Sequence, residues 1–185
     1  MRLVAADAGL LREARRVLVV GASGGGKSTL SRKLSGLLDL PYISMDREFF
    51  WLPGWKLRDR AEIGAMIADA VAGERWIMDG TSPGTLPLRL PRTDVVIWLR
   101  MPRLLCLSRI VRRRWRYAGQ SRPEMTPGCP EKIDLPFLRY VWNFERTESP
   151  EIEAALARHG PGVPVMTLRR PADTAALVAS LERHV

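Results

Sequence analysis

The sequence predicts an α/β fold in which helices cover both faces of a parallel sheet, and two observations lead to this prediction. Short runs rich in β-branched residues alternate with segments of helical spacing, which is the pattern of β-α-β units. A glycine-rich segment also lies between the first apolar run and the first helical segment, at the edge where parallel sheets bind ligands. The expected strands are residues 16–20, 41–45, 75–78, 94–99 and 163–168.

The remaining segments complete a single domain, which suits a chain of 185 residues. Residues 1–15 are expected to be an N-terminal extension, helical or frayed, before a domain that covers 16–185. Residues 81–91 hold three prolines and predict a loop, and residues 118–136, rich in Gly, Pro and Ser, predict a lid. The expected helices run from the glycine-rich segment to residue 39, then over 62–71, 102–117, 138–158 (a pair broken at Pro150) and 173–184.

The glycine-rich segment from Gly21 to Ser28 matches the phosphate-binding pattern G-x-x-x-x-G-K-[ST] at every fixed position. Glycines let backbone N–H groups point at a phosphate, Lys27 adds a charge for the β and γ oxygens, and the Ser28 hydroxyl is a ligand for Mg²⁺. The dinucleotide pattern fails because Ser23 stands where its second glycine belongs. We therefore expect ATP and Mg²⁺ in a three-layer P-loop NTPase fold. The residues expected to hold the nucleotide are Gly21, Ser23, Gly24, Gly25, Gly26, Lys27, Ser28 and Thr29.

Two aspartates, Asp46 and Asp79, each end an expected strand, where open α/β sheets bind ligands. Asp79 suits an acid that holds Mg²⁺ together with Ser28. Asp46 suits an acceptor of the attacking hydroxyl proton, a general base or a further Mg²⁺-water ligand. Either residue is also compatible with a simple turn or helix cap. Asp94 precedes its strand and is expected to be structural.

An aromatic segment follows Asp46 and is too broken by proline and glycine to form a regular strand. Its rings either cover the sheet edge as core or form the wall of a substrate pocket, and the sequence favours neither. The candidates for a substrate wall are Phe50, Trp51 and Trp55, beside Asp46.

The net charge of +9 is concentrated in one part of the chain. Residues 100–122 contain eight arginines and no acidic residue, whereas the rest of the chain is nearly neutral. The eight are Arg100, Arg103, Arg109, Arg112, Arg113, Arg114, Arg116 and Arg122. A local excess of this kind indicates a specific anionic partner, either the phosphates of a small ligand or a nucleic acid backbone.

The helix expected over 102–117 separates these charges from its apolar residues. At about 100° per residue, one stripe is apolar, and Arg109, Arg113 and Arg116 fall together on the opposite side. The stripe consists of Leu104, Leu107, Val111 and Trp115. Because clustered guanidinium groups without acids repel one another, we expect an anion among these arginines. Arg139 and Arg146, two turns apart on the next helix, are placed to approach the same anion across the lid.

Other features exclude several classes of protein. The longest apolar runs are a few residues, too short for a membrane span or a secretory signal, so we expect no membrane partner and a cytoplasmic location. The two cysteines, Cys106 and Cys129, have neither the spacing of a zinc site nor a second pair for a disulfide framework.

Four segments together resemble bacterial FlaR-type "DNA topology modulation" proteins, which are P-loop ATPases related to adenylate kinases. They are the P-loop, the string Phe50-Trp51-Leu52-Pro53-Gly54-Trp55, the string Trp76-Ile77-Met78-Asp79-Gly80, and the string Gly128-Cys129-Pro130-Glu131-Lys132-Ile133-Asp134. The resemblance extends from about residue 16 to the end. This chain departs from the family at Thr81-Ser82, where Asn-Tyr is usual.

The resemblance implies a five-stranded parallel sheet in the order 2-3-1-4-5 with a helical lid. It also implies that Arg109 lies near adenine or ribose and that Arg113 contacts the transferred phosphate, since the segment around both is similar to the arginine segment of the adenylate kinase lid. The family name records a link to DNA supercoiling.

Two functions from different classes remain for this chain. The first is a kinase that transfers the γ-phosphate of ATP to a nucleotide or small-molecule acceptor, with Lys27, Asp46, Arg109, Arg113 and Arg139 as catalytic candidates. The second is a DNA-binding P-loop ATPase or regulator that uses the arginine patch on backbone phosphates. The sequence favours the kinase, because the patch lies at the expected lid and no DNA-reading motif is evident.

Overall fold

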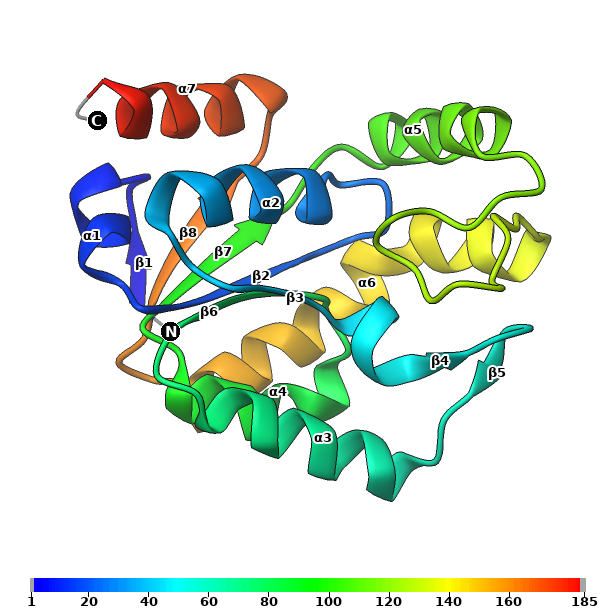
Figure 1. Ribbon diagram of the computed structural model, residues 1–185. Coiled ribbons are helices and arrows are strands. Elements are labelled where there is room, and N and C mark those ends of the chain that lie inside the picture. Colours follow the sequence, from blue (N-terminus) through cyan, green and yellow to red (C-terminus); the bar gives the residue numbers. More distant parts are fainter. Residues whose placement is uncertain (1, 184–185) are drawn as a thin grey trace.

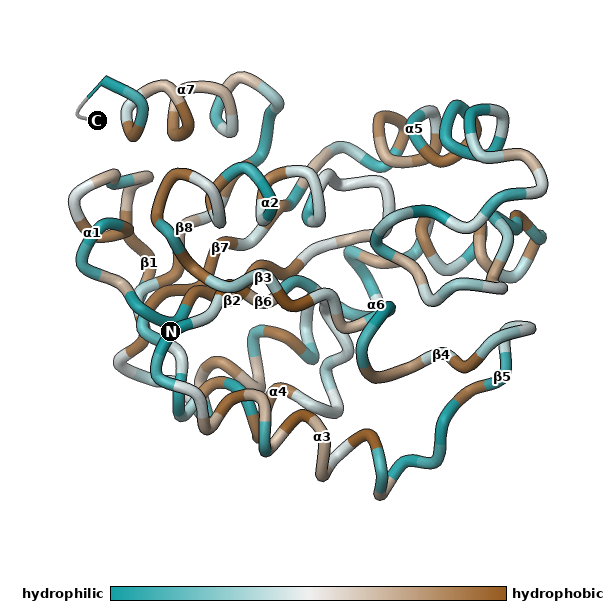
Figure 2. Tube along the Cα trace, in the orientation of Figure 1, coloured by the Kyte–Doolittle hydropathy of each residue, from teal (hydrophilic) through white to brown (hydrophobic). Residues whose placement is uncertain are grey.

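The computed structural model describes residues 2–183, and its centre is a six-stranded parallel sheet in the order β1-β8-β7-β2-β6-β3. The strands are β1 (Arg2–Val4), β2 (Arg16–Gly21), β3 (Tyr42–Ser44), β6 (Trp76–Asp79), β7 (Val95–Leu99) and β8 (Pro164–Leu168). The residues of β6 and β7 are all buried, and the strands are mostly brown in the hydropathy view (Figure 2). Continuous apolar strands of this kind are typical of a sheet covered on both faces.

The order of the five expected strands is correct, but the expected number is wrong. β1 adds a sixth strand at the edge beside β8, with Leu3 paired to Val165. The helix α1 (Ala8–Glu13) follows, capped by Asp7, and its Leu11 is fully buried in the core. Of the two alternatives for residues 1–15, the helical one is correct for Ala8–Glu13, and the described part of this segment belongs to the fold rather than to a separate extension. A three-residue edge strand carries too short a pattern to be recognised in a sequence.

Helices form the outer layers (Figure 1). On one face lie α1, α2 (Lys27–Leu38) and α7 (Pro171–Glu182), and on the other lie α3 (Arg60–Ala72), α4 (Leu86–Arg89) and most of α6 (Leu135–His159). The helix α5 (Arg103–Arg116) packs against α6 beyond the carboxyl ends of the strands. Residue 184, the expected end of the last helix, lies outside the described residues.

The break expected at Pro150 is wrong, because α6 is one helix that contains this proline. Proline removes one backbone donor and disfavours a helix interior. The helix continues because both of its halves are anchored in the core, by Phe144 before the proline and by Ile152 after it. Tertiary packing thus outweighs the local preference.

Of the two segments expected to be irregular, one contains short helices and the other does not. Residues 81–91 contain short helical turns: η2 (Pro83–Thr85), α4 and η3 (Leu90–Arg92). The lid, expected over residues 118–136, ends at residue 134 because α6 begins at Leu135; this lid segment, 118–134, has no helix of its own and runs as turns between α5 and α6. A helical lid is therefore not present within the described residues; helices only flank it.

The segment after β3 forms a π-helical turn, η1 (Asp46–Phe50), and then a small hairpin of β4 (Trp51–Leu52) and β5 (Lys56–Leu57). Figure 1 shows the hairpin projecting from the carboxyl end of the sheet. This arrangement positions Asp46 and the aromatic residues at the same edge as the phosphate-binding loop.

Candidate active site

The glycine-rich loop joins β2 to α2 through tight backbone contacts. Gly21 and Gly24 have φ angles of 140° and 77°, which favour glycine. A Cβ on Gly24 would lie 2.3 Å from the carbonyl oxygen of Cys106, and one on Gly21 would lie 2.3 Å from that of Leu99. Gly26 begins α2 without a side-chain cap, so the first N–H groups of that helix are free for an anion.

Lys27 lies over this loop. Its Nζ donates hydrogen bonds to the carbonyl oxygens of Gly21, at 2.8 Å, and Ala22, at 3.1 Å. Burial lowers the pKa of Lys27, while the charges of Asp79 and Asp46 raise it. The ammonium group is thus held at the loop by weak carbonyl partners, which a phosphate oxygen can replace.

Asp79 and Ser28 lie together beside the loop. Asp79 ends β6, the strand next to β2, and is paired in register with Val19. Burial raises the pKa of Asp79, and a hydrogen bond from Ser28 together with the charge of Lys27 lowers it. A carboxylate and a hydroxyl are oxygen ligands that Mg²⁺ accepts. These two residues, expected from the sequence to hold Mg²⁺, would hold it here.

Asp46 is exposed at the start of η1, just beyond β3. Its charge raises the pKa of Lys27, Arg113 and Tyr140, so it lies within electrostatic range of all three. Asp46 is therefore open to an incoming group on one side and close to the phosphate-binding loop on the other. The sequence did not indicate Tyr140, which comes from α6, about ninety positions further along the chain.

The aromatic segment divides between two roles. Phe49 is buried and Phe50 packs partly against the core, so this end of the segment covers the sheet edge as core, the first of the two alternatives. Trp51 and Trp55 contact each other edge to face, with ring centroids 5.2 Å apart. The indole N–H of Trp55 donates to the carbonyl of Pro130 at 3.0 Å. The tryptophans are thus tied to the lid segment, and their contact with a substrate stays a prediction.

The lid segment is bonded to the residues around Asp46. The Thr126 hydroxyl lies 2.9 Å from the carbonyl of Arg47 and 2.8 Å from that of Trp51. The N–H of Gly54 donates to the carbonyl of Gly128 at 2.9 Å. These contacts join segments about eighty positions apart into one unit that covers the Asp46 side of the site.

The arginines expected to gather around an anion are separated in the structure. Arg109 donates to the carbonyl of Gly25 at 3.1 Å, so it contacts the phosphate-binding loop. Arg113 pairs with the buried carboxylate of Glu131 at 2.7 Å. Arg116 is exposed and lies over the ring of Tyr117.

The expectation that no acid accompanies these arginines is wrong. Glu131, from the lid, also pairs with Arg122 at 2.5 Å, so a carboxylate of this chain stands between two guanidinium groups. Burial and the charge of Arg122 lower the pKa of Arg113, and Glu131 raises it. Arg139 and Arg146 are both exposed on α6, and neither forms an ion pair within the described residues. Glu131 lies outside the arginine-rich residues 100–122, so the charge pattern does not reveal it. Its place in the string 128–134 is the one feature of the sequence that points to it.

Two residues near the loop were missed by sequence reasoning. The Thr81 hydroxyl accepts from the N–H of Gly21 at 2.9 Å and lies 2.7 Å from its carbonyl oxygen. Arg89, fully buried on α4, donates to the carbonyls of Gly80 and Thr81 at 2.7 and 2.5 Å. Burial lowers the pKa of Arg89 to about 9. Both residues fix the segment that follows Asp79.

Asp94 is structural, as expected. Its carboxylate accepts hydrogen bonds from the backbone N–H groups of Arg15 and Arg16 and pairs with the Arg16 guanidinium at 2.7 Å. These contacts lie at the opposite end of the strands from the site. The partners of Asp94 also lower its pKa, although burial alone would raise it.

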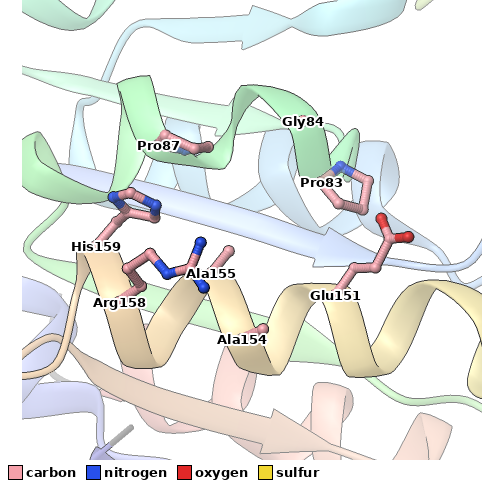
Figure 3. Close-up of a pocket in the computed structure, with 8 residues that line it drawn as sticks. All are labelled: Pro83, Gly84, Pro87, Glu151, Ala154, Ala155, Arg158 and His159. Atoms are coloured by element: carbon pink, nitrogen blue, oxygen red, sulfur yellow. The ribbon is translucent and has the colours of Figure 1, made fainter.

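The remaining features that the structure describes provide no second candidate active site or metal site. Cys106 and Cys129 are buried and unpaired, and the described residues contain no group of three or more side chains suited to a metal. A shallow depression of about 260 Å³ lies between α4 and α6, with Glu151 and His159 near its ends (Figure 3). It contains none of the expected site residues. Over residues 2–183, no helix is both long and apolar enough to cross a bilayer.

Comparisons with known proteins identify the fold. No protein-family model and no curated protein sequence matches the chain. Among solved structures, a shikimate kinase from Acinetobacter baumannii in complex with shikimate is similar, with a TM-score of 0.57 and 16% identity over 96% of this chain and 97% of that one. A shikimate kinase from Bacteroides thetaiotaomicron has a TM-score of 0.55 and 16% identity over 92% and 98%. The chain therefore shares the fold of these two shikimate kinases, while the narrower FlaR-type resemblance finds no support in these matches.

Proposed function

We propose that this protein is an ATP-dependent phosphotransferase that moves the γ-phosphate of ATP to a hydroxyl group of a small acceptor. The observation that carries the proposal is the convergence of Lys27, Ser28 and Asp79 on one uncapped helix N-terminus, with exposed Asp46 in electrostatic range. Such a site holds phosphates on one side and leaves an acid free on the other. The shared fold with shikimate kinases is consistent with this division.

Each residue has a separate task in the proposed reaction. The backbone N–H groups of residues 21–28 and the Lys27 ammonium bind the phosphates and stabilise the charge that develops on them. Bound Mg²⁺ would neutralise the β and γ oxygens. Asp46 accepts the proton of the acceptor hydroxyl as that oxygen attacks the γ-phosphorus. Arg113, held by Glu131, contributes positive charge next to Asp46.

The acceptor site is proposed to lie between Asp46, the tryptophan pair and Tyr140. Burial and the charges of Glu148 and Asp46 raise the pKa of Tyr140, so its hydroxyl stays protonated and can donate a hydrogen bond. The resemblance of the aromatic and 128–134 strings to FlaR-type proteins rests on the sequence alone and does not name an acceptor.

The DNA-binding alternative is less well supported. Of the eight arginines in the patch, Arg100 pairs with Glu145 and Glu153, and Arg113 and Arg122 share Glu131. Arg109 is directed to the P-loop. Half of the patch is therefore engaged inside the molecule and is not free for a backbone of phosphates.

The test is an acceptor screen with ATP and Mg²⁺ that measures ADP release. Small polyols, hydroxy acids and nucleoside monophosphates are offered to the wild type and to Asp46→Asn. We expect at least one acceptor to raise ADP release in the wild type only, with ATP binding by calorimetry equal in both proteins. Failure to bind ATP–Mg²⁺ would overturn the proposal, as would ADP release that no acceptor stimulates.

A further inference from the structure

The outer face of α5 carries apolar side chains that the rest of the molecule leaves uncovered. Leu104 is 68% exposed, Val111 47% and Trp115 82%. The core-facing side of the same helix is formed by Cys106 and Ile110. Three of the four residues of the stripe recognised in the sequence therefore face solvent, and the fourth, Leu107, packs partly against the core.

The N-terminal half of α6 extends this apolar surface. A groove of about 450 Å³ lies between the two helices, lined by Leu107, Val111, Leu135, Leu138, Arg139 and Trp142. Leu135 is 80% exposed and Trp142 44%. Figure 2 shows brown segments on both helices here. Exposed apolar patches of this kind on a folded protein indicate an interaction site.

Arginines border the stripe on both sides. At about 100° per residue, Arg103 and Arg114 lie along one edge and Arg112 along the other. None of the three forms an ion pair within residues 2–183, although twelve such pairs occur elsewhere. Arg139 stands unpaired on the α6 side of the groove. The patch thus has an apolar centre and a positive rim.

We propose that this surface, formed by the outer face of α5 and the first half of α6, docks on an anionic lipid bilayer. A helix with apolar and tryptophan side chains on one face and arginines beside them lies in the plane of a membrane interface. The apolar side chains enter the acyl boundary, the tryptophans lie at the headgroup level, and the arginines attract anionic headgroups. This arrangement requires no membrane-spanning segment.

Other occupants fit the surface less well. A nucleic acid needs positive charge at the centre of its site and open ring faces, but the Trp142 ring is covered by the Arg103 guanidinium at 4.1 Å. A second copy would bring like charge against like. A peptide in the groove would leave Leu104 and Trp115 uncovered, because neither lines it, whereas a planar surface contacts groove and stripe together.

The test is co-sedimentation of the full chain with vesicles of phosphatidylcholine or of equal parts phosphatidylcholine and phosphatidylglycerol. We expect binding to the anionic vesicles that weakens with added salt, because salt screens the attraction of the arginines. Leu104→Gln/Trp115→Gln should lower the affinity by about tenfold or more. Arg112→Gln/Arg114→Gln should lower it by about tenfold and leave the weak binding to phosphatidylcholine unchanged.

The matched control is Leu88→Gln, an exposed leucine on α4, which is outside the proposed surface. It should sediment like the wild type, and circular dichroism and ATP binding should confirm that all variants are folded. The proposal is overturned if the anionic vesicles do not bind the protein or if the double variants bind as tightly as the control. It is also overturned if a DNA duplex or an acidic helical peptide binds the wild type more tightly than the vesicles do, and loses that affinity in Leu104→Gln/Trp115→Gln.

Discussion

The two halves of the candidate site are built in different ways. The nucleotide side is made by residues 21–28 and the adjacent end of β6, and its key side chains are fixed by backbone groups of the same loop and the neighbouring strand. The proposed acceptor side consists of Asp46, the lid segment and Tyr140 of α6, and hydrogen bonds from Thr126 join the lid to the segment after Asp46, about eighty positions away. The first half is held by contacts within one loop and its neighbouring strand, whereas the second depends on contacts between the lid and the segment after β3.

The largest effect is expected on the nucleotide side. Lys27→Ala should lose most of the ATP affinity and lower turnover by about 10³-fold, because it removes the ammonium group that lies on this loop and is expected to neutralise the β and γ oxygens. Calorimetry with ATP–Mg²⁺ measures it. Lys33→Ala, on the exposed side of α2 where Lys33 pairs with Glu182, is the matched control and should bind normally. Equal affinities of the two variants would refute the assignment of the loop.

A substitution on the proposed acceptor side should lower kcat and leave the affinity for ATP unchanged. Asp46→Asn should lower kcat by about 10²-fold or more with unchanged ATP affinity, because the amide cannot accept the proton of the acceptor. Glu48→Gln, two positions along and also exposed, is the control. If both variants keep full activity, Asp46 is a turn residue and the division between the two sides fails.

A smaller effect tests the lid. Glu131→Gln leaves two half-buried guanidinium groups, Arg113 and Arg122, without their carboxylate, and it should lower both the thermal midpoint and kcat, the latter by about tenfold. Glu124→Gln removes another buried lid carboxylate, whose ion-pair partner is Arg32 of α2 and not an arginine of α5. It should lower stability while kcat stays near the wild-type value. Equal kcat values in the two variants would remove Arg113 from the mechanism.

The smallest expected effect is a pH dependence of Mg²⁺-dependent ATP binding on the nucleotide side. Mg²⁺ binds a deprotonated carboxylate, so Mg²⁺-dependent ATP binding should weaken a few-fold as the pH falls through the raised pKa of Asp79, and Asp79→Asn should remove this dependence.

The stability of the unliganded protein should change in the opposite direction. A carboxyl whose folded pKa lies above its unfolded value contributes most below about pH 4, and this contribution is lost as the pH rises through the folded pKa. Thermal midpoints measured from pH 4 to 8, compared with Asp79→Asn, test the sign. A wild type that gains stability over this range relative to the variant would contradict the burial of an ionisable Asp79.

The same contrast explains what the sequence predicts. The positions of Lys27, Ser28 and Asp79 follow from local patterns, because a loop motif and strand ends determine them. The order of the five expected strands follows from the family resemblance and not from the local patterns. The partners Glu131 and Tyr140 do not follow, since they reach the site through the lid and α6. The exposure of Trp115 also escapes a pattern that records amphipathicity but not which side faces the core.

The edge strand and the intact helix were missed for related reasons. β1 is held by three paired residues at the sheet edge, and α6 continues through Pro150 because its two halves are buried. In both cases tertiary contacts decide the outcome, and the local signal is weak or points the other way.

The central claim is that the acceptor side directs the phosphoryl group to a substrate rather than to water. The most direct measurement follows γ-labelled ATP with the wild type and an acceptor that stimulates ADP release. The account predicts label on the acceptor at a rate well above its release as inorganic phosphate, with loss of the acceptor product in Asp46→Asn. Label found only as inorganic phosphate, at the same rate with and without acceptor, would contradict it.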